Sequence, residues 1–455
     1  MTFTSVNPNT GRPIRSYPAA SPAELERAVG EAGHAFRSWR RSGFPERSRC
    51  LREAARLLRA RAGEYARLMA EEMGKPVRAG RAEAEKCAWV CEYVAERGPL
   101  QLAPEAVATD ASRSFVSFQP LGSILAIMPW NFPFWQVFRF AAPNLMAGNA
   151  ALLKHAPNVP GCALALEQLF RQAGFPKGLF RSLLVPVEQV GALIEDPRVQ
   201  GVTLTGSVRA GREVARQAGQ ALKKTVLELG GSDPYVVLSD ADVEAAARTC
   251  VESRLTNSGQ SCIAAKRLIV VECLRAEFEA RVVEGMGAAH TGDPLREDTD
   301  VGPLAREDLR RRLHRQVAES VDRGARCLLG GQLPAGPGFF YPPTVLTEVA
   351  SGMPAYEEEL FGPVAAILSA KDDRDAVRMA NDTAFGLGAA VFTGDPAIGE
   401  SLATEELQAG CCFVNASVRS DPRLPFGGIK RSGYGRELSA FGIREFVNIK
   451  TVWVA

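Results

Sequence analysis

The chain has 455 residues, more than one ordinary hydrophobic core accommodates, so two or three domains are expected. Hydrophobic residues make up 46% of the chain and charged residues 23%, a composition typical of soluble globular proteins. The 54 basic and 52 acidic residues leave a formal charge of only +2. This balance gives no electrostatic reason to expect nucleic acid or a membrane surface as a partner.

Targeting and metal-binding patterns are also absent from the sequence. The first residues have neither the basic start nor the apolar stretch of a secretory signal, and no apolar run approaches the roughly 18 residues of a transmembrane helix. The ten cysteines form no CxxC pair, and the four histidines lack zinc-ligand spacing. The sequence therefore predicts a cytoplasmic protein with no metal site and with mostly buried, reduced cysteines.

The N-terminal part is expected to be mainly helical. Ser21-Pro22-Ala23-Glu24 forms a capping box with proline in the first turn, and apolar residues then recur at helical spacing until Gly74. We predict helix over residues 21–73 and again over 81–97. Residues 113–119 alternate like a strand, and 124–128 form a short apolar run.

From residue 148 onward, predicted strands alternate with predicted helices. The strands are 150–154, 180–185, 201–205, 225–229 and 235–238, and the helices are 162–173, 187–194 and 211–223. This alternation predicts a parallel sheet with helices on both faces, followed by a second α/β stretch to about residue 414. Residues 446–454 alternate like a strand that has no partner nearby in sequence, which favours oligomerisation through that strand.

Three segments carry residue types suited to catalysis. Cys262 follows Gly-Gln-Ser in a turn, where a helix N-terminus would lower the thiol pKa, although a buried structural cysteine fits as well. Glu228, before two glycines at a strand end, suits a general base for water, or else it is a solvated carboxylate. Asn131 lies in the rigid segment 129–133, where its amide suits an oxyanion, unless that segment is only an aromatic corner.

A fourth segment suits a phosphate. Thr203-Leu-Thr-Gly-Ser207 is a strand that runs into a helix, and free N–H groups at a helix N-terminus bind pyrophosphate well. The glycine spacing differs from the GxGxxG of the common dinucleotide fingerprint, so this segment alone is weak support.

Taken together and in order, these segments resemble the aldehyde dehydrogenase superfamily over nearly the whole chain. The matching motifs are PWNFP at 129–133, TGS at 205–207, ELGG at 228–231, GQSC at 259–262, EEELFGPV at 357–364, NDTAFGLGAAVF at 381–392 and PFGGIKRSGYGRE at 425–437. The resemblance implies NAD(P)-dependent oxidation of an aldehyde to a carboxylic acid. Cys262 would be the nucleophile, Asn131 with the Cys262 backbone N–H the oxyanion site, and Glu228 the base that activates water.

The resemblance also implies a cofactor site. Gly206 and Ser207 would contact the pyrophosphate and Lys154 the adenosine ribose. At the other end of the cofactor, Glu359 would contact the nicotinamide ribose, with Trp130 and Phe361 nearby. Family members selective for NAD often have a glutamate three residues after the lysine, where this chain has Pro157. Nothing there repels a 2′-phosphate, so we expect NAD or NADP to serve.

Within the family, the chain resembles bacterial succinate-semialdehyde dehydrogenases. The features that carry this resemblance are KHAPN at 154–158, the short chain and Arg139. Arg139 would face the substrate tunnel and pair with a carboxylate, although a surface or interface arginine is the alternative. Ser420 is the better candidate for a second carboxylate contact than Asp421. Thr256 replaces an arginine that some semialdehyde dehydrogenases have six residues before the nucleophile, so anion recognition is expected to be looser.

The family fold implies three parts in this chain. They are a Rossmann-like cofactor domain (1–112 and 133–232), an α/β catalytic domain (233–416), and a β oligomerisation arm (113–132 and 417–455) of a homodimer or homotetramer. The alternatives left open are a broad-range or medium-chain aldehyde dehydrogenase, a cysteine hydrolase without a redox step, and a silent structural protein with the same fold.

Overall fold

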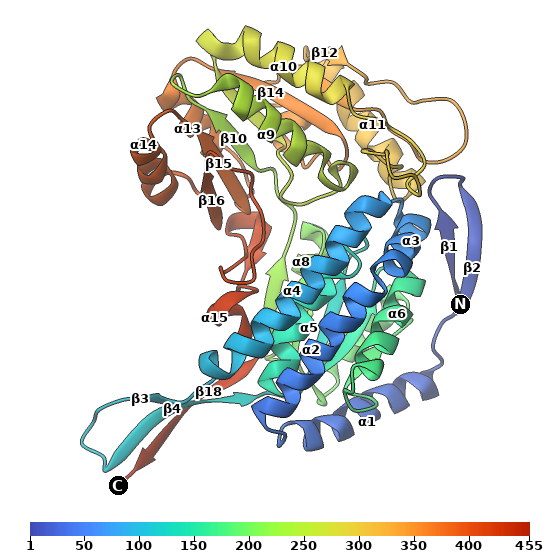
Figure 1. The fold of residues 1–455 in the computed structure, drawn as a ribbon, viewed down its shortest axis with the longest axis vertical. Helices are drawn as coiled ribbons and strands as arrows, with labels where there is room; N and C mark the ends of the chain where they lie inside the picture. Colours follow the sequence, from blue (N-terminus) through green and yellow to red (C-terminus); the bar gives the residue numbers. More distant parts are fainter.

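The computed structural model describes residues 1–455 and contains two open α/β sheets and a small antiparallel sheet. An N-terminal hairpin of β1 (Thr2–Asn7) and β2 (Arg12–Pro18) precedes them. Figure 1 shows the larger sheet with its helices at the top, the other sheet and its helices below, and the small sheet projecting at the lower left. The predicted α/β class is confirmed.

The first unit is built on a six-stranded sheet of order β17-β9-β8-β5-β6-β7. Its strands are β17 (Gly433–Tyr434), β9 (Lys224–Glu228), β8 (Val199–Thr205), β5 (Ser123–Met128), β6 (Ala150–His155) and β7 (Phe180–Ser182). All neighbours are parallel except β17 and β9. The chain runs outward from β5 through β6 to β7 and then restarts at β8 on the other side of β5. In such a doubly wound sheet, ligands bind at the carboxyl ends of the strands where the order reverses.

Eight helices accompany this sheet. They are α1 (Pro22–Trp39), α2 (Phe44–Ala60), α3 (Ala62–Met73), α4 (Val77–Gln101), α5 (Trp135–Ala147), α6 (Pro160–Gln172), α7 (Val190–Glu195, after the turn η1, Val187–Gln189) and α8 (Val208–Gln220). The capping box at Ser21 and Glu24 is present, as predicted. Residues 21–73, expected as one helix, form three, because Gly43 and Pro45 start a new helix and the chain bends again at Arg61.

The second unit is built on a seven-stranded sheet of order β12-β13-β14-β11-β10-β15-β16. Its strands are β12 (Arg326–Leu329), β13 (Thr344–Thr347), β14 (Val364–Ala370), β11 (Arg267–Val271), β10 (Pro234–Val237), β15 (Gly388–Phe392) and β16 (Cys411–Val414). Only β12 and β13 are antiparallel. Tyr235 and Val237 pack into one apolar cluster and Val236 into another, because alternate side chains of a strand point to opposite faces. The sheet therefore has a core on each face.

The helices of the second unit are α9 (Val243–Leu255), α10 (Arg275–Gly287), α11 (Glu307–Asp322), α12 (Pro354–Glu357), α13 (Asp373–Asn381) and α14 (Pro396–Ser401). Short helical turns lie at η2 (Thr256–Gly259), η3 (Glu272–Leu274), η4 (Leu402–Glu406) and η5 (Lys430–Ser432), and α15 (Ser439–Ile443) precedes the last strand. No helix is long and apolar enough to cross a membrane, and no three His, Cys, Asp or Glu side chains converge as metal ligands would.

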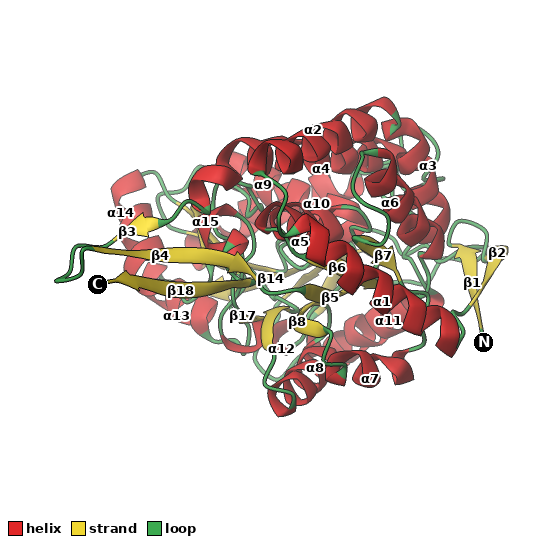
Figure 2. Cartoon of the chain, turned by 90° about the horizontal axis from the view of Figure 1, so that it is seen from below, coloured by secondary structure: helices red, strands yellow, loops and turns green.

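The small sheet joins β3 (Glu105–Ala106), β4 (Arg113–Pro120) and β18 (Val447–Val454), all antiparallel. The C-terminal strand, for which the sequence offered no local partner, thus pairs with β4 of its own chain. Figure 2 shows β4 and β18 extending side by side away from the rest of the molecule, with the C-terminus near their tip. The order β18-β4-β3 leaves the outer edge of β18 unpaired, and Ile449 and Trp453 are exposed on this strand.

The expected division into domains needs correction at two strands. Residues 113–132 were assigned to the arm, but β5 lies in the middle of the six-stranded sheet, between β8 and β6. Residues 417–455 were assigned there too, but β17 is the edge strand of the same sheet. Leu125 in β5 is fully buried, so this apolar strand requires cover on both faces, which a thin arm does not supply.

Candidate active site

The predicted motifs of the first unit meet at one edge of the six-stranded sheet. Asn131 follows β5, Gly206 and Ser207 follow β8, and Glu228 is the last residue of β9. These strands are parallel neighbours, so their carboxyl ends lie together, at the point where the strand order reverses. The sheet topology therefore explains why segments that are far apart in sequence form one site.

Two cavities meet at Cys262. The first, of ≈ 170 Å³, is lined by Trp130, Asn131, Gly206, Ser207, Glu359 and Phe361 among others. The second, of ≈ 410 Å³, is lined by Arg139, Thr256 and Ser420 among others. Only Cys262 and Gln136 line both cavities. The Cys262 thiol is therefore within reach of ligands in both cavities.

The loop that carries Cys262 has an unusual backbone. Asn257, Ser258 and Gly259 have φ of 56°, 56° and 75°, in the left-handed region that side chains disfavour. A Cβ at Gly259 would lie 2.2 Å from the carbonyl carbon of Gly362, so only glycine fits there. Arg254 is fully buried and donates to the Gly259 carbonyl at 2.6 Å.

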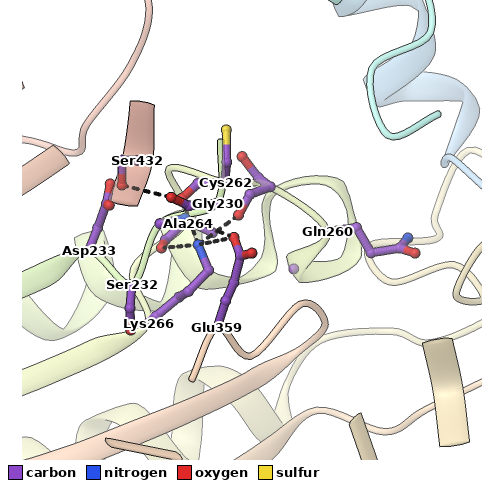
Figure 3. A network of polar contacts seen from close by, with 12 residues as sticks. Gly230, Ser232, Asp233, Gln260, Cys262, Ala264, Lys266, Glu359 and Ser432 are labelled. Carbon is purple, nitrogen blue, oxygen red and sulfur yellow. Dashed lines mark hydrogen bonds and ion pairs between the residues drawn. The ribbon is translucent and has the colours of Figure 1, made fainter. Parts of the chain in front are cut away.

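A buried lysine holds the other end of this loop. Lys266 donates from Nζ to the carbonyl oxygens of Ser261 (2.9 Å) and Cys262 (2.7 Å). Figure 3 shows Lys266 between Cys262 and Glu359. Its Nζ lies 3.7 Å from Oε1 of Glu359, which accepts a hydrogen bond from the Gly231 backbone N–H at 3.1 Å. A Cβ at Gly231 would lie 2.8 Å from the Cys262 carbonyl oxygen. The absence of a side chain at Gly231 thus allows the two units to approach closely.

The prediction of a lowered Cys262 pKa is wrong. Cys262 lies in a turn before β11, and no helix begins there. Burial raises the pKa of its thiol to about 12, and the positive charges of Arg139 and Lys266 only partly oppose this rise. The nucleophile candidate is therefore a protonated thiol at neutral pH.

The groups expected to stabilise an oxyanion are near the thiol. The Asn131 side-chain amide donates to the Gln260 carbonyl at 3.1 Å, which leaves its second N–H for a ligand. The backbone N–H of Cys262 donates to no acceptor within the chain. The Asn131 carbonyl in turn accepts from the Asn257 side chain at 2.7 Å, so the two loops are joined directly.

Glu228 is placed differently from the other two catalytic candidates. Its side chain is buried and lines neither cavity, although the next residues, Leu229 and Gly230, line the first. Its Oε1 has no hydrogen-bond partner. Burial raises the pKa of this carboxyl well above its usual range, Arg139 opposes the rise, and Glu437 adds to it. A strand-end carboxylate in solvent, the alternative interpretation, is thereby excluded.

Arg139 lies on α5 and is 2% exposed, so it is not a surface arginine. Its Nε forms an ion pair with Glu437, its guanidinium lies 4.6 Å from the ring centroid of Phe426, and its Nη2 is 3.4 Å from the Thr205 hydroxyl. It also lines the second cavity. Arg139 therefore faces the cavity as predicted, but with a protein carboxylate already beside it.

Ser420 is buried and lines the second cavity, and its hydroxyl accepts from Lys86 Nζ at 2.8 Å. Asp421 forms an ion pair with Arg423 at 2.7 Å and does not line the cavity. The structure therefore agrees with the choice of Ser420 over Asp421 as the residue that faces the cavity.

The first cavity has an anion site suited to the pyrophosphate of a dinucleotide. Ser207 caps α8 by accepting from the Ala210 backbone N–H at 3.3 Å, so this helix N-terminus opens beside Gly206 at the sheet edge. The first N–H groups of a helix have no partner within it and attract an anion such as pyrophosphate. Lys154 lies buried at the end of β6, outside the lining of this cavity.

Sequence reasoning missed three residues of the site. Glu437 lies within the motif at 425–437, so a signal for it was present. Gln136, which lines both cavities, and Lys86, which lines the second, lie outside the quoted motifs. For Lys86, nothing in the local sequence separates it from the other charged residues of a helix.

The fold and the site define a dinucleotide-dependent oxidoreductase with a cysteine nucleophile. A family profile described as the aldehyde dehydrogenase family matches residues 1–452, and the chain belongs to this family. It is therefore an NAD(P)-dependent aldehyde dehydrogenase, as the motifs predicted.

Similar proteins match over their full length. A probable succinate-semialdehyde dehydrogenase [NADP(+)] of Synechocystis sp. is 49% identical, covering 100% of both chains. A succinate semialdehyde dehydrogenase [NAD(P)+] of Escherichia coli is 48% identical over 99% of this chain and 97% of its own. The crystal structure of succinic semialdehyde dehydrogenase from Streptococcus pyogenes with NADP+ superimposes with a TM-score of 0.97 at 35% identity, covering 99% of each chain.

Replacing Gly259 with alanine is expected to disable the site, because the added Cβ collides with the Gly362 carbonyl and displaces the Cys262 loop. We expect kcat to fall by about 10²-fold or more, as when one oxyanion donor is misplaced. Steady-state kinetics measures this, and G219A, where a Cβ meets nothing within 4 Å, is the matched control. Full activity in G259A would show that the loop tolerates a different backbone.

Alkylation of Cys262 by iodoacetamide is expected to accelerate about tenfold per pH unit between pH 7 and 9 in the free enzyme. The reason is that a thiol with a pKa of about 12 has a small thiolate fraction that grows with pH throughout this range. Peptide mass spectrometry follows the modification at Cys262, with C262S as the control. A rate that levels off below pH 8 would contradict the raised pKa.

Proposed function

We propose that this enzyme oxidises succinate semialdehyde to succinate, with NADP+ or NAD+ as the oxidant, through a thioester on Cys262. The observation that carries the proposal is the position of Cys262 between the first cavity, which Gly206 and Ser207 line at the N-terminus of α8, and a second cavity lined by Arg139 and Ser420. The names of the full-length relatives agree with this substrate.

In the first half of the reaction, the Cys262 thiol loses its proton to solvent, its sulfur bonds to the aldehyde carbon, and the carbonyl oxygen becomes an oxyanion. The Asn131 amide and the Cys262 backbone N–H donate to that oxygen, and each such donor contributes about 10²–10³ in rate. Gly206, Ser207, Glu359, Trp130 and Phe361 would hold the dinucleotide, which when bound would supply the acceptor for the hydride of this carbon. Loss of the hydride leaves an acyl thioester on Cys262.

In the second half, Glu228 removes a proton from water, and the hydroxide adds to the thioester carbon. The carbon–sulfur bond then breaks, releasing the carboxylic acid and the Cys262 thiolate. A carboxyl whose pKa is raised by burial holds a proton more strongly, which suits a general base near neutral pH. Since Glu228 lines neither cavity, its side chain must turn to reach water in the first cavity.

The carboxylate of the substrate would bind Arg139 and Ser420 at the far side of the second cavity from the cofactor groove. Glu437 already neutralises part of the Arg139 charge, so this contact is weaker than that of an unpaired arginine. A broad-range aldehyde dehydrogenase remains the second candidate, and the same Arg139–Glu437 pair favours it, because it offers a purely structural role for the arginine.

Both nicotinamide cofactors are expected to serve. Pro157 stands where NAD-selective relatives have a glutamate, so no carboxylate there repels a 2′-phosphate. Lys154, three residues earlier, is a cation that could attract this phosphate. We also propose a cytoplasmic homodimer or homotetramer that associates through the unpaired edge of β18.

The proposed substrate predicts a strong preference for succinate semialdehyde over butanal, an uncharged aldehyde of the same length. We expect kcat/KM to differ by about 100-fold, or roughly 2.7 kcal/mol of selective binding. Nicotinamide reduction is followed with each cofactor. Near-equal values would favour the broad-range enzyme.

In the same assay, Arg139→Ala should reduce this ratio by about tenfold or more. Both substrates should also slow, because Arg139 lowers the pKa of Cys262 and of Glu228. Only the ratio is therefore diagnostic. If kcat/KM falls by the same factor for both aldehydes, Arg139 acts only through Glu437 and the catalytic groups and does not bind the substrate carboxylate.

Glu228→Gln is expected to stop the reaction after the first half. One equivalent of reduced nicotinamide per site should form rapidly, followed by turnover that is slower by about 10²–10⁴-fold, because nothing removes the proton from water. Stopped-flow absorbance measures the burst, and mass spectrometry detects the acyl group on Cys262. A slow first turnover without a burst would show instead that Glu228 acts on the thiol before acylation.

A further inference from the structure

The second cavity contains a cation that the mechanism above does not use. Lys86 on α4 lines this cavity together with Cys262 and Ser420. Its Nζ donates to the Ser420 hydroxyl at 2.8 Å and lies 4.4 Å from the ring centroid of Trp135. These contacts leave two ammonium N–H groups without a protein acceptor, and Lys86 forms no ion pair.

The other charged residues that line this cavity either form an ion pair within the protein or are exposed to solvent. Arg139 is paired with Glu437. Glu83 is paired with Lys75 and also accepts from the backbone N–H groups that begin α5. Glu252 and Arg419 line the cavity but are exposed residues. The buried part of the cavity therefore has one cation that no carboxylate neutralises.

We propose that Lys86 is a specificity-determining residue whose ammonium, together with the Ser420 hydroxyl, binds the distal carboxylate of a short ω-oxo acid in the second cavity. The inference rests on the proposed function, which it deepens by naming the principal anion contact. Thr256, at the position where some semialdehyde dehydrogenases have a second arginine, lines the same cavity. Lys86 would supply the missing positive charge from α4.

The electrostatics of Lys86 agree with this role. Burial and the neighbouring charge of Arg139 lower the pKa of its ammonium to about 8, while Cys87, Glu83 and Asp421 oppose the shift weakly. A bound carboxylate stabilises the charged form and raises this pKa again, so charged Lys86 and an anionic ligand favour each other. A neutral aldehyde gains nothing from that coupling.

The first test compares K86Q, K86R and the wild type with succinate semialdehyde and butanal. We expect K86Q to reduce the semialdehyde-to-butanal ratio of kcat/KM by about tenfold or more, mainly through KM for the semialdehyde. K86R, which keeps the charge, should recover most of the ratio. K371Q, an exposed lysine outside both cavities, is the matched control and should keep the wild-type ratio.

The second test follows the same ratio against pH in the wild type. The ratio should fall as pH rises through about 8, because Lys86 loses its charge in the free enzyme. Ionisation of Cys262 and Glu228 affects both aldehydes and cancels in the ratio. In K86R and K86Q the ratio should not change over this range. The wild-type measurement needs no variant to fold, so it decides the matter if K86Q is unstable.

The outcomes separate the inference from the function on which it rests. A wild-type ratio near one overturns the proposed substrate and the role of Lys86 together. A large wild-type ratio that neither K86Q nor pH alters overturns the role of Lys86 alone and leaves Arg139 and Ser420 as the anion contacts.

Discussion

The site depends on the buried ammonium of Lys266. It joins the carbonyls of Ser261 and Cys262 and lies 3.7 Å from Glu359, which also accepts from the turn after β9. A buried cation is costly unless its donors are satisfied, so these partners are held firmly in place. One side chain thus fixes the nucleophile loop, a cofactor-site carboxylate and the junction of the two sheets.

Burial shifts the pKa of three ionisable groups of the site, Cys262, Glu228 and Lys86, towards the neutral form. It raises the pKa of Cys262 and of Glu228 and lowers that of Lys86. Arg139 acts on all three: its charge favours the thiolate and the carboxylate and disfavours a second cation. Arg139 therefore acts on all three groups proposed as nucleophile, base and anion contact, and Glu437 neutralises part of its charge.

The two cavities meet at Cys262, one proposed for the dinucleotide and the other for the substrate. Groups suited to a dinucleotide come from the carboxyl edge of the six-stranded sheet and from Glu359, while the second cavity draws Lys86 and Arg139 from α4 and α5 and Ser420 from the segment after β16. An aldehyde carbon at Cys262 is thereby accessible from one side to the oxidant and from the other to the rest of its own molecule.

Much of this was accessible from the amino-acid sequence. The ordered motifs identified the family and singled out Cys262 and Asn131, whose catalytic roles stay predictions. The alternation of strands and helices predicted the parallel sheets, and Ser21 with Glu24 predicted a helix start. These features depend on local residue patterns, which short-range geometry and hydrogen bonding decide. The breaks within residues 21–73 were also local, at Gly43 and Pro45, but the long apolar periodicity obscured them.

Tertiary structure alone decided the rest. The Cys262 pKa depends on burial by segments from both units. The residues next to Cys262 in the sequence do not indicate this burial. The central place of β5 depends on β8, which lies some 70 residues later in the chain, as parallel pairing requires long connections. Lys86 and Ser420 are 334 residues apart, and their contact exists only because the packed fold brings α4 against the segment after β16. Contacts of this kind follow from how whole elements pack, and a local pattern does not contain that information.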